Sequence, residues 1–285
     1  MVVSVLLDTD IGDDIDDAWA VALCLRHPEV RLEGIATVWG DTVTRAALAR
    51  LLVETAGVAG VEVAAGSRDA LDRILEPRKQ SYAEALDVEG QRLRQGRTDA
   101  VRFMAETIRR NPGLTLVSIG PLTNVARLHL EFPRESSMLS RQVMMCGHLI
   151  PGRNGPEYNA GCDPRATRIA LSTMVPKSVV GLDVTLKCGL TEDDLQAMKS
   201  RGTPLASALH RMTALWQESS KALPVMHDPL AVMAAVDEGV VEFKQLSVKT
   251  DDKGNLTAAE GGSKVDFAVG VDAASLRRKL IEIIG

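Results

Sequence analysis

The sequence of 285 residues has few cysteines, few aromatic residues and little net charge, and each scarcity argues against a class of protein. The four cysteines lie far apart without a Cys-x-x-Cys pair, which argues against a disulfide framework or a zinc knuckle and favours reduced thiols. Aromatic residues make up 3% of the chain, too few for a platform on which single-stranded nucleic acid stacks. A formal net charge of -5 argues against binding of phosphate backbones, so we expect no nucleic-acid partner.

Long hydrophobic runs are also missing. No apolar stretch approaches the roughly 20 residues that a membrane-spanning helix needs. The apolar run at residues 1–7 is too short for a signal peptide and ends in an acidic cluster. We therefore expect a globular protein of the cytoplasm that has no membrane partner, with enough apolar residues (45%) for a large core.

Strand-like and helix-like hydrophobic patterns alternate along most of the chain. Residues 2–7 form a short β-branched run typical of a strand buried on both faces, and residues 16–26 follow with helical spacing. Further strands are predicted at 32–38, 61–65, 114–119, 142–146, 178–184 and 265–271, and further helices at 43–56, 99–110, 122–130, 164–171 and 273–284. This alternation predicts an α/β fold, an open and mostly parallel sheet with helices on both faces and right-handed crossovers.

Two segments interrupt the alternation. Residues 66–98 are polar and charged without a clear period, which suggests a surface excursion or lid, and residues 190–238 are rich in helix. No internal repeat and no Pro/Gly/Ser-rich linker divides the chain. We therefore expect one domain, residues 1–285, in which the helix-rich segment 190–238 contributes to the active-site pocket.

The most informative segment is an acidic turn after the first strand, Asp8-Thr9-Asp10-Ile11-Gly12-Asp13-Asp14-Ile15-Asp16-Asp17-Ala18. It holds six aspartates within ten residues, and ligands of open α/β sheets bind beyond the carboxyl ends of the strands. Crowded carboxylates raise one another's pKa unless a cation neutralises them, and a hard divalent ion such as Ca²⁺ or Mg²⁺ suits oxygen ligands. The simpler alternative is a helix capped by solvated acids.

Two known patterns can be compared with this turn. An EF-hand loop counted from Asp8 fails, because its glycine falls at the fifth position and its twelfth residue is Trp19. A haloacid-dehalogenase-type phosphatase also has Asp-x-Asp after its first strand, and Asp8 would be its nucleophile. Such enzymes usually have Thr or Val at the position of Gly12 and have no use for Asp16-Asp17, but this alternative stays open.

The turn resembles more closely the amino-terminal signature of the inosine–uridine-preferring nucleoside hydrolases, Asp-x-Asp-Pro-Gly-x-Asp-Asp-Ala. Ile11 stands in place of the usual proline, and two additional residues precede Asp16-Asp17-Ala18. We align Asp16-Asp17 with the family's second acidic pair, because an apolar helix follows both in the same phase. Spacing counted from Gly12 would select Asp13-Asp14 instead.

Four further blocks resemble the family in the same order along the chain. Trp39-Gly40-Asp41 resembles the end of its second strand, with Asp41 where an Asn is common, and Ile119-Gly120-Pro121-Leu122-Thr123-Asn124 resembles its strand-to-helix turn. Glu157-Tyr158-Asn159 resembles its Glu-Phe-Asn block, and His227-Asp228-Pro229 its His-Asp-Pro. Each block alone also fits an ordinary turn or helix cap. Together, over residues 5–231, they identify the chain as a member of this family.

The resemblance implies Ca²⁺-dependent hydrolysis of the N-glycosidic bond of ribonucleosides to ribose and free base. It implies metal ligation by Asp10, Asp17, the carbonyl of Ile119, and Asp228. Asp10 would also take the proton of the attacking water, and His227 would be the second catalytic residue. The implied substrate-binding residues are Asp16, Asp41, Asn154, Glu157 and Asn159. Members commonly form dimers or tetramers, so we expect a homodimer or homotetramer.

The sequence does not determine which base is preferred. Purine-active members carry a His-Gly block after the third strand, whereas residues 81–87 of this chain contain no histidine. His227, His148 and Cys146 are candidates for a group near the leaving base, and Trp216 and Tyr82 for a wall against which the base stacks. Because the His-Gly block is missing and Asp41 replaces Asn, a catalytically idle nucleoside-binding protein remains a third hypothesis.

Overall fold

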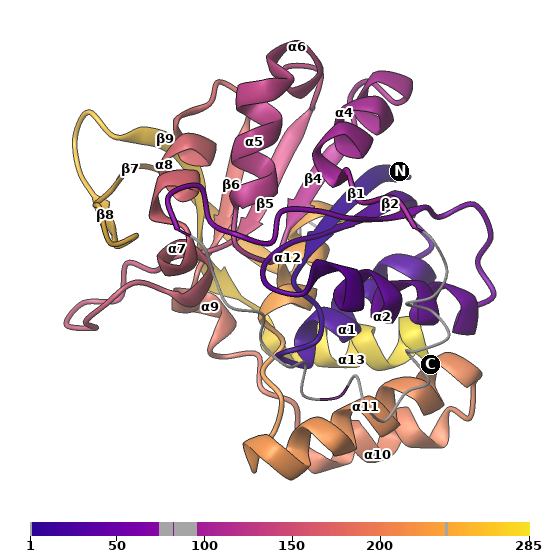
Figure 1. Ribbon diagram of the computed structural model, residues 1–285. Coiled ribbons are helices and arrows are strands. Elements are labelled where there is room, and N and C mark those ends of the chain that lie inside the picture. Colours follow the sequence, from indigo (N-terminus) through magenta and orange to yellow (C-terminus); the bar gives the residue numbers. More distant parts are fainter. Residues whose placement is uncertain (1, 74–81, 83–95, 237–238) are drawn as a thin grey trace.

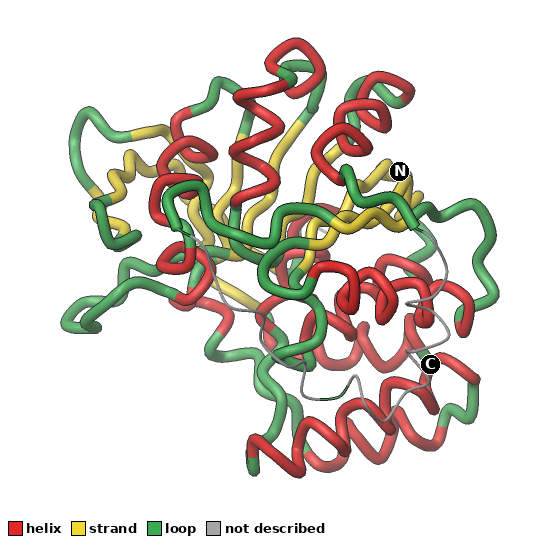
Figure 2. The backbone as a smooth tube through the Cα atoms, viewed as in Figure 1, coloured by secondary structure: helices red, strands yellow, loops and turns green. Residues whose placement is uncertain are grey.

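The structure of the protein, a computed structural model, describes residues 2–73, 82, 96–236 and 239–285. The described residues form one sheet in the order β3-β2-β1-β4-β5-β6-β9-β7-β8, with helices on both of its faces (Figures 1 and 2). The strands are β1 (Val3–Thr9), β2 (Val30–Thr37), β3 (Val63–Ala65), β4 (Thr115–Ser118), β5 (Arg141–Met145), β6 (Lys177–Val180), β7 (Val241–Thr250), β8 (Leu256–Ala258) and β9 (Ser263–Val271). The first seven strands in this order, from β3 at the edge to β9, pair in parallel with their neighbours, whereas β7 is antiparallel to β9 and β8. The predicted fold class is confirmed.

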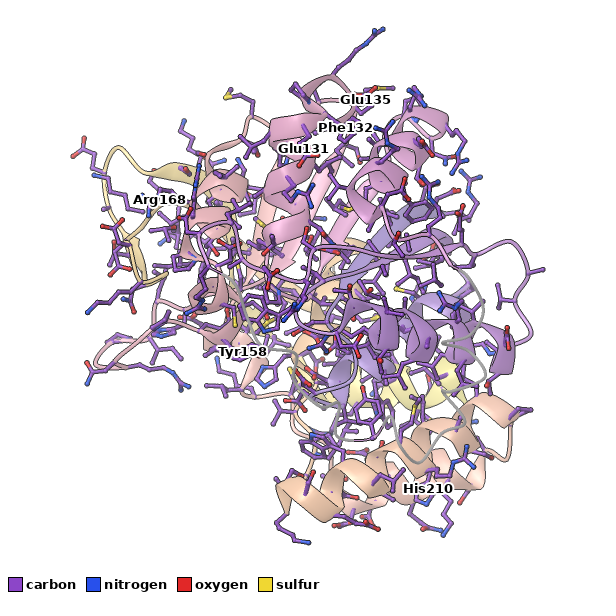
Figure 3. The ribbon with its side chains drawn as sticks, viewed as in Figure 1. Glu131, Phe132, Glu135, Tyr158, Arg168 and His210 are labelled. Atoms are coloured by element: carbon purple, nitrogen blue, oxygen red, sulfur yellow. The ribbon has the colours of Figure 1, made fainter. Side chains whose placement is uncertain are left out.

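The helices divide between the two faces of the sheet. On one face, α1 (Asp16–Arg26), α2 (Thr42–Thr55), α12 (His227–Val236) and α13 (Ala273–Ile284) pack on the strands, and α10 (Glu192–Ser200) and α11 (Pro204–Ser220) cover them. On the other face lie α4 (Ala100–Arg110), α5 (Thr123–Glu131) and α8 (Pro164–Ser172). The short helices are α6 (Pro133–Ser136), α7 (Tyr158–Cys162) and α9 (Leu182–Thr185). In Figure 3, Glu131 of α5 and His210 of α11 mark the two outer layers, and Tyr158 lies between them.

The central strand β1 has apolar residues at three successive positions, 5–7, because both of its faces are covered. Val5 and Leu7 are buried in the core that contains α1 and α12, whereas Leu6 between them is buried in the core that contains α4 and α5. Successive side chains of a strand point to opposite faces, so a strand covered on both sides needs apolar residues at every position. The strand order reverses between β1 and β4, and this reversal creates a crevice at their carboxyl ends.

Some predicted elements differ from the structure. The strand predicted at 178–184 ends at Val180, and the helix α9 begins at Leu182, because a short apolar run has no period that distinguishes strand from buried helix. The antiparallel strands β7 and β8 were not predicted, although residues 241–250 are rich in β-branched and aromatic side chains. Most of the predicted excursion at 66–98 lies outside the described residues.

Two negative expectations can be compared with the described part of the chain. Among the helices described, none combines the length and apolarity required to cross a bilayer. All four cysteines are buried as free thiols, as expected from their spacing.

Candidate active site

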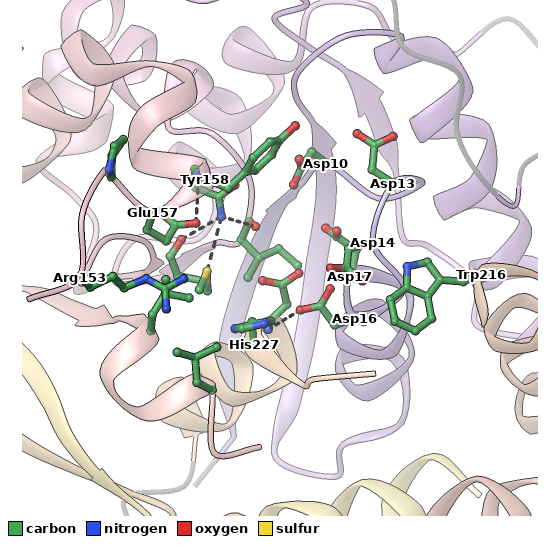
Figure 4. A pocket seen from close by; sticks show the side chains of 17 residues that line it. Asp10, Asp13, Asp14, Asp16, Asp17, Arg153, Glu157, Tyr158, Trp216 and His227 are labelled. Carbon is green, nitrogen blue, oxygen red and sulfur yellow. Dashed lines mark hydrogen bonds between the residues drawn. The ribbon is translucent and has the colours of Figure 1, made fainter. Parts of the chain in front are cut away.

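A pocket of about 570 Å³ opens where β1 and β4 end and α1 and α12 begin (Figure 4). Strand β1 leads into the acidic turn, and both helices bring their first turn to the pocket. The lining is unusually rich in carboxylates and includes one arginine: Asp10, Asp13, Asp14, Asp16, Asp17, Ile119, Met145, Arg153, Pro156, Glu157, Tyr158, Asn159, Leu182, Leu186, Trp216, His227 and Asp228.

Three of these carboxylates form a compact group. Asp16 and Asp17 from α1 and Asp228 from α12 are buried, and each offers an oxygen within 4.8 Å of the other two. Burial, with repulsion between neighbouring carboxylates, raises the pKa of each far above the ordinary value of 3.8. Hydrogen bonds hold two of them, because Thr9 Oγ1 donates to Asp17 Oδ1 at 2.5 Å and the Asp228 amide to Asp16 Oδ2 at 3.2 Å.

This group fits a hard divalent cation. Its donor atoms are all carboxylate oxygens, the ligands that Ca²⁺ and Mg²⁺ prefer. Burial and mutual repulsion raise the pKa of these acids, and a bound cation would return them to the charged form. Of the two acidic pairs that the sequence offered, Asp16-Asp17 belongs to this group, while Asp13 forms an ion pair with Arg45 at 2.8 Å.

Asp10 faces the same pocket from the end of β1, outside the group of three. Burial raises its pKa to about 7, an effect that the positive charge of Arg45 reduces. A β-carbon on Gly120 would lie 2.7 Å from Asp10 Oδ1, so the glycine after β4 leaves room for this carboxylate.

The opposite side of the pocket is fixed by backbone hydrogen bonds. Glu157 precedes α7, and its carboxylate accepts from the amides of Gly147 at 2.8 Å, Asn159 at 2.7 Å and Ala160 at 3.0 Å. Asn159 Nδ2 donates to the carbonyls of Ile119 and Met145, both at 3.0 Å. The amide therefore ties together the ends of β4 and β5. Ile119 lines the pocket, and a carbonyl oxygen can accept a second partner.

His227 begins α12 and lines the pocket beside the carboxylates. Its Nδ1 lies 2.7 Å from Thr185 Oγ1, a buried hydroxyl on α9. Burial, with the nearby charge of Arg153, lowers the pKa of His227 to about 4, so the ring is neutral near neutral pH. Thr185 was not predicted from the sequence, since nothing in its local pattern relates it to a histidine 42 residues away.

Two predicted substrate-binding residues do not line the pocket. The Asp41 carboxylate caps α2, where it accepts from the Thr44 amide at 3.1 Å and the Thr44 hydroxyl at 2.7 Å, as Asp commonly does at a helix start. Asn154 is exposed on the loop before Glu157, and its neighbour Arg153 lines the pocket instead. Loop residues have no periodicity from which the direction of a side chain could be predicted.

Of the remaining candidates from the sequence, one lines the pocket and three do not. Trp216 lines the pocket, whereas the buried Tyr82 hydroxyl donates to the Asp14 carbonyl at 3.1 Å. Neither His148 nor Cys146 is among the lining residues. His148 Nε2 lies 2.9 Å from the Gly155 carbonyl, and Cys146 is fully buried.

Asp8 is not placed for nucleophilic attack. Its side chain is fully buried, accepts from Asn124 Nδ2 at 2.8 Å and does not line the pocket. Burial raises the pKa of Asp8 to about 8, which favours the uncharged acid. The phosphatase alternative, which needs an accessible Asp8 carboxylate, is therefore not favoured.

The chain is similar over nearly its whole length to nucleoside hydrolases. Residues 5–278 match the model of the family described as inosine-uridine preferring nucleoside hydrolase. An inosine-uridine preferring nucleoside hydrolase of Leishmania major is 30% identical over 281 residues, covering 92% of this chain and 87% of that protein. A probable uridine nucleosidase 1 of Oryza sativa subsp. japonica is 29% identical over 269 residues, covering 88% and 82%.

A solved structure agrees with this assignment. The chain superimposes on a plant nucleoside hydrolase with a TM-score of 0.84 and 26% identity, covering 99% of this chain and 98% of the other. These relatives are enzymes, which does not favour the hypothesis of a catalytically idle binding protein. The chain therefore belongs to the inosine-uridine preferring nucleoside hydrolase family, whose members act on N-glycosyl bonds.

Proposed function

We propose that this protein hydrolyses the N-glycosidic bond of ribonucleosides in a Ca²⁺-dependent reaction that yields ribose and free base. The observation that carries the proposal is the convergence of Asp16, Asp17 and Asp228 beside Asp10 in one pocket. Asp16 and Asp228 are 212 residues apart in the sequence. Buried carboxylates are costly to assemble without a cation, and such assemblies are typical of functional sites.

The proposed ligands of the cation are Asp10, Asp17, the Ile119 carbonyl and Asp228, all of which line the pocket. Asp16, the third carboxylate of the group, lies where it can bind the cation or the ribose. A bound Ca²⁺ would supply positive charge beside the ribose hydroxyls and the attacking water.

The chain's own residues supply the remaining chemistry. Water attacks the anomeric carbon, the C–N bond breaks, and the base leaves with the bonding electrons. Asp10 accepts the proton that the water loses, a role that a carboxylate lining the pocket can fill. Glu157 and Asn159 bind ribose hydroxyls, and their hydrogen bonds to backbone groups keep both side chains oriented before the substrate arrives.

The leaving base needs a proton or a hydrogen bond as its negative charge develops. His227 is the proposed donor, because its ring lines the pocket and one nitrogen is already engaged by Thr185. Trp216 and Leu186 provide apolar surface on which a base can rest. We make no assignment between purines and pyrimidines.

We further propose that residues 1–285 act as one domain and that segment 190–238 provides part of the pocket wall through Trp216 and His227. The proposed setting is the cytoplasm, and the proposed assembly is a homodimer or homotetramer. Sedimentation of the purified protein tests the assembly, since a monomer at micromolar concentration would contradict it.

A nucleoside panel tests the activity. The purified protein is incubated with purine and pyrimidine ribonucleosides, and free ribose and base are measured with added Ca²⁺, with chelator, and after Ca²⁺ is restored. We expect release with Ca²⁺, loss with chelator and recovery on restoration. Full activity in chelator would refute the calcium dependence. Binding of Ca²⁺ and nucleosides without any release would refute the hydrolase function and support an idle binding protein.

A further inference from the structure

Arg45 lies in the first turns of α2, yet its guanidinium is fully buried between the turn after β1 and the turn after β2. Its Nη1 donates to the carbonyls of Asp10 and Ile11, the latter at 3.0 Å. Its Nη2 donates to Asp13 Oδ2 at 2.8 Å, and its Nε to the Trp39 carbonyl at 2.6 Å. A guanidinium has five N–H donors in one rigid plane, so these four acceptors occupy most of them.

The acceptors belong to two segments, residues 10–13 and Trp39, and neither is part of a helix. Trp39 has a φ of 73°, in the left-handed region that a residue with a side chain seldom adopts. Such a conformation persists only where surrounding interactions compensate its energy. The hydrogen bond from Arg45 to the Trp39 carbonyl and that from the Trp39 amide to the Ser67 carbonyl at 2.8 Å are such interactions.

The charge of Arg45 is opposite to that of the acidic turn after β1. Asp13 and Asp14 both lie in this turn, between Gly12 and the start of α1 at Asp16. Arg45 forms an ion pair with Asp13 and opposes the negative charge of Asp10 and Asp17. A buried guanidinium is costly unless acceptors surround it, and here the acidic turn provides three of the four.

We propose that Arg45 is a positioning residue for the cation site, which holds residues 10–13 in the shape that directs Asp10 and Asp17 toward one ion. This inference rests on the proposed calcium site. Arg45 is not among the residues that line the pocket, so it acts through the turn and touches neither cation nor substrate. Removal of the guanidinium would leave the carbonyls of Asp10 and Ile11 without this donor and free the turn to move.

Calorimetric titration of chelator-treated protein with Ca²⁺ tests the proposal. We expect Arg45→Met to weaken Ca²⁺ binding by about 10- to 100-fold, the usual effect of removing a group that orients metal ligands. Arg45→Lys keeps the charge without the planar fork and should restore part of the affinity. Asp13→Asn removes the ion pair but keeps the carbonyl hydrogen bonds, so its loss should be smaller than that of Arg45→Met.

Asp163→Ala is the matched control for loss of stability alone. Asp163 is buried outside the pocket lining and accepts from the Leu71 amide at 2.8 Å, the Thr123 hydroxyl at 2.7 Å and the Ala166 amide at 3.0 Å. This variant should lower the melting temperature of the metal-free protein, as Arg45→Met does, and leave the Ca²⁺ affinity as in the wild type.

Wild-type affinity in folded Arg45→Met would overturn the proposal, and so would an equal loss of affinity in Asp163→Ala. If Arg45→Met does not fold, Arg45→Lys and Asp13→Asn decide, because wild-type affinity in both refutes the role. A wild-type protein that binds no Ca²⁺ also overturns it. A wild-type protein that binds Ca²⁺ but hydrolyses no nucleoside refutes the proposed function, and the affinities of the variants still decide the role of Arg45.

Discussion

The backbone amide of Asp228 donates a hydrogen bond to Asp16 Oδ2 at 3.2 Å, although 212 residues separate the two in sequence. Each residue lies in the first turn of a helix, and these helices, α1 and α12, pack against each other on one face of the sheet. The amino-terminal end of a helix favours negative charge. Two such ends meeting at one pocket therefore create a place where several buried carboxylates can be held together.

Replacement of Asp10 should impair catalysis, whereas replacement of Asp41, which caps a helix, should not. Asp10→Asn should reduce kcat for nucleoside hydrolysis by about 100- to 10,000-fold, because an amide cannot accept the proton of the attacking water. Asp41→Asn is the control, since the Asp41 carboxylate caps α2 and Asn is an equally good cap. Steady-state kinetics of both variants measure the difference. An Asp41→Asn enzyme as impaired as Asp10→Asn would contradict the separation.

The stability of the metal-free protein should depend on pH in the direction opposite to that given by a carboxylate whose pKa a salt bridge lowers. Burial raises the pKa of Asp10 from 3.8 to about 7 and that of Asp8 to about 8. Between pH 3.8 and about pH 8 the folded state binds more protons than the unfolded state, so the free energy of unfolding falls as pH rises. Ca²⁺ displaces protons from the cluster, so the gain in melting temperature that it produces should grow with pH.

Thermal unfolding at several pH values across this interval, with chelator and with Ca²⁺, measures both effects. Asp8→Asn is a useful companion, since it removes one group whose raised pKa does not depend on the cluster of three carboxylates. Its metal-free stability should fall less steeply with pH than that of the wild type. A metal-free wild type that gains stability as pH rises would contradict the assignment of these pKa directions.

The hydrogen bond between Thr185 and His227 should raise kcat more for a substrate with a poor leaving group than for one with a good leaving group. A hydroxyl that donates to Nδ1 leaves the ring proton on Nε2, and the neutral ring can then donate a hydrogen bond from Nε2 to the departing base as its negative charge develops. Thr185→Val should lower kcat on nucleosides by at least about tenfold, because the Nε2 hydrogen bond to the leaving base is misplaced, and Thr185→Ser should restore it. A 4-nitrophenyl riboside needs no such donor, because its phenolate leaves unprotonated.

The same kinetics with both substrates therefore distinguish the loss of the hydrogen bond to the leaving group from general damage to the fold. We expect His227→Ala and Thr185→Val to hydrolyse the 4-nitrophenyl riboside nearly as fast as the wild type. Equal losses on nucleosides and on the activated riboside would show that the pair serves only to support the fold.

Gly120 should tolerate no side chain, for a reason specific to the site. A β-carbon there would lie 2.7 Å from Asp10 Oδ1 and 2.8 Å from Val38 Cγ1. Gly120→Ala should displace the Asp10 carboxylate, lower kcat, and destabilise the fold by about 1–3 kcal/mol through overpacking. Gly189→Ala meets nothing within 4 Å and should leave activity and melting temperature close to the wild type. Wild-type kinetics in Gly120→Ala would mean that Asp10 is not confined at this position.

Much of the architecture follows from local patterns in the sequence. The apolar run before Asp8 predicted a buried central strand, and the spacing of residues 16–26 predicted the helix α1 with the observed bounds. These predictions succeed because the alternation of side chains along a strand or helix records which faces are buried. The order of the acidic turn, Glu157-Tyr158-Asn159 and His227-Asp228-Pro229 was sufficient to identify the family before any fold was known.

The sequence by itself determined the α/β alternation, the acidic turn and the family. Tertiary structure alone decided that Asp41 caps a helix, that Arg153 faces the pocket beside an exposed Asn154, and that Arg45 is buried against the acidic turn. Periodicity records burial along one element, but it carries no information on where separate loops converge. That convergence depends on packing between helices far apart in the chain, and it determines which of many aspartates share one site.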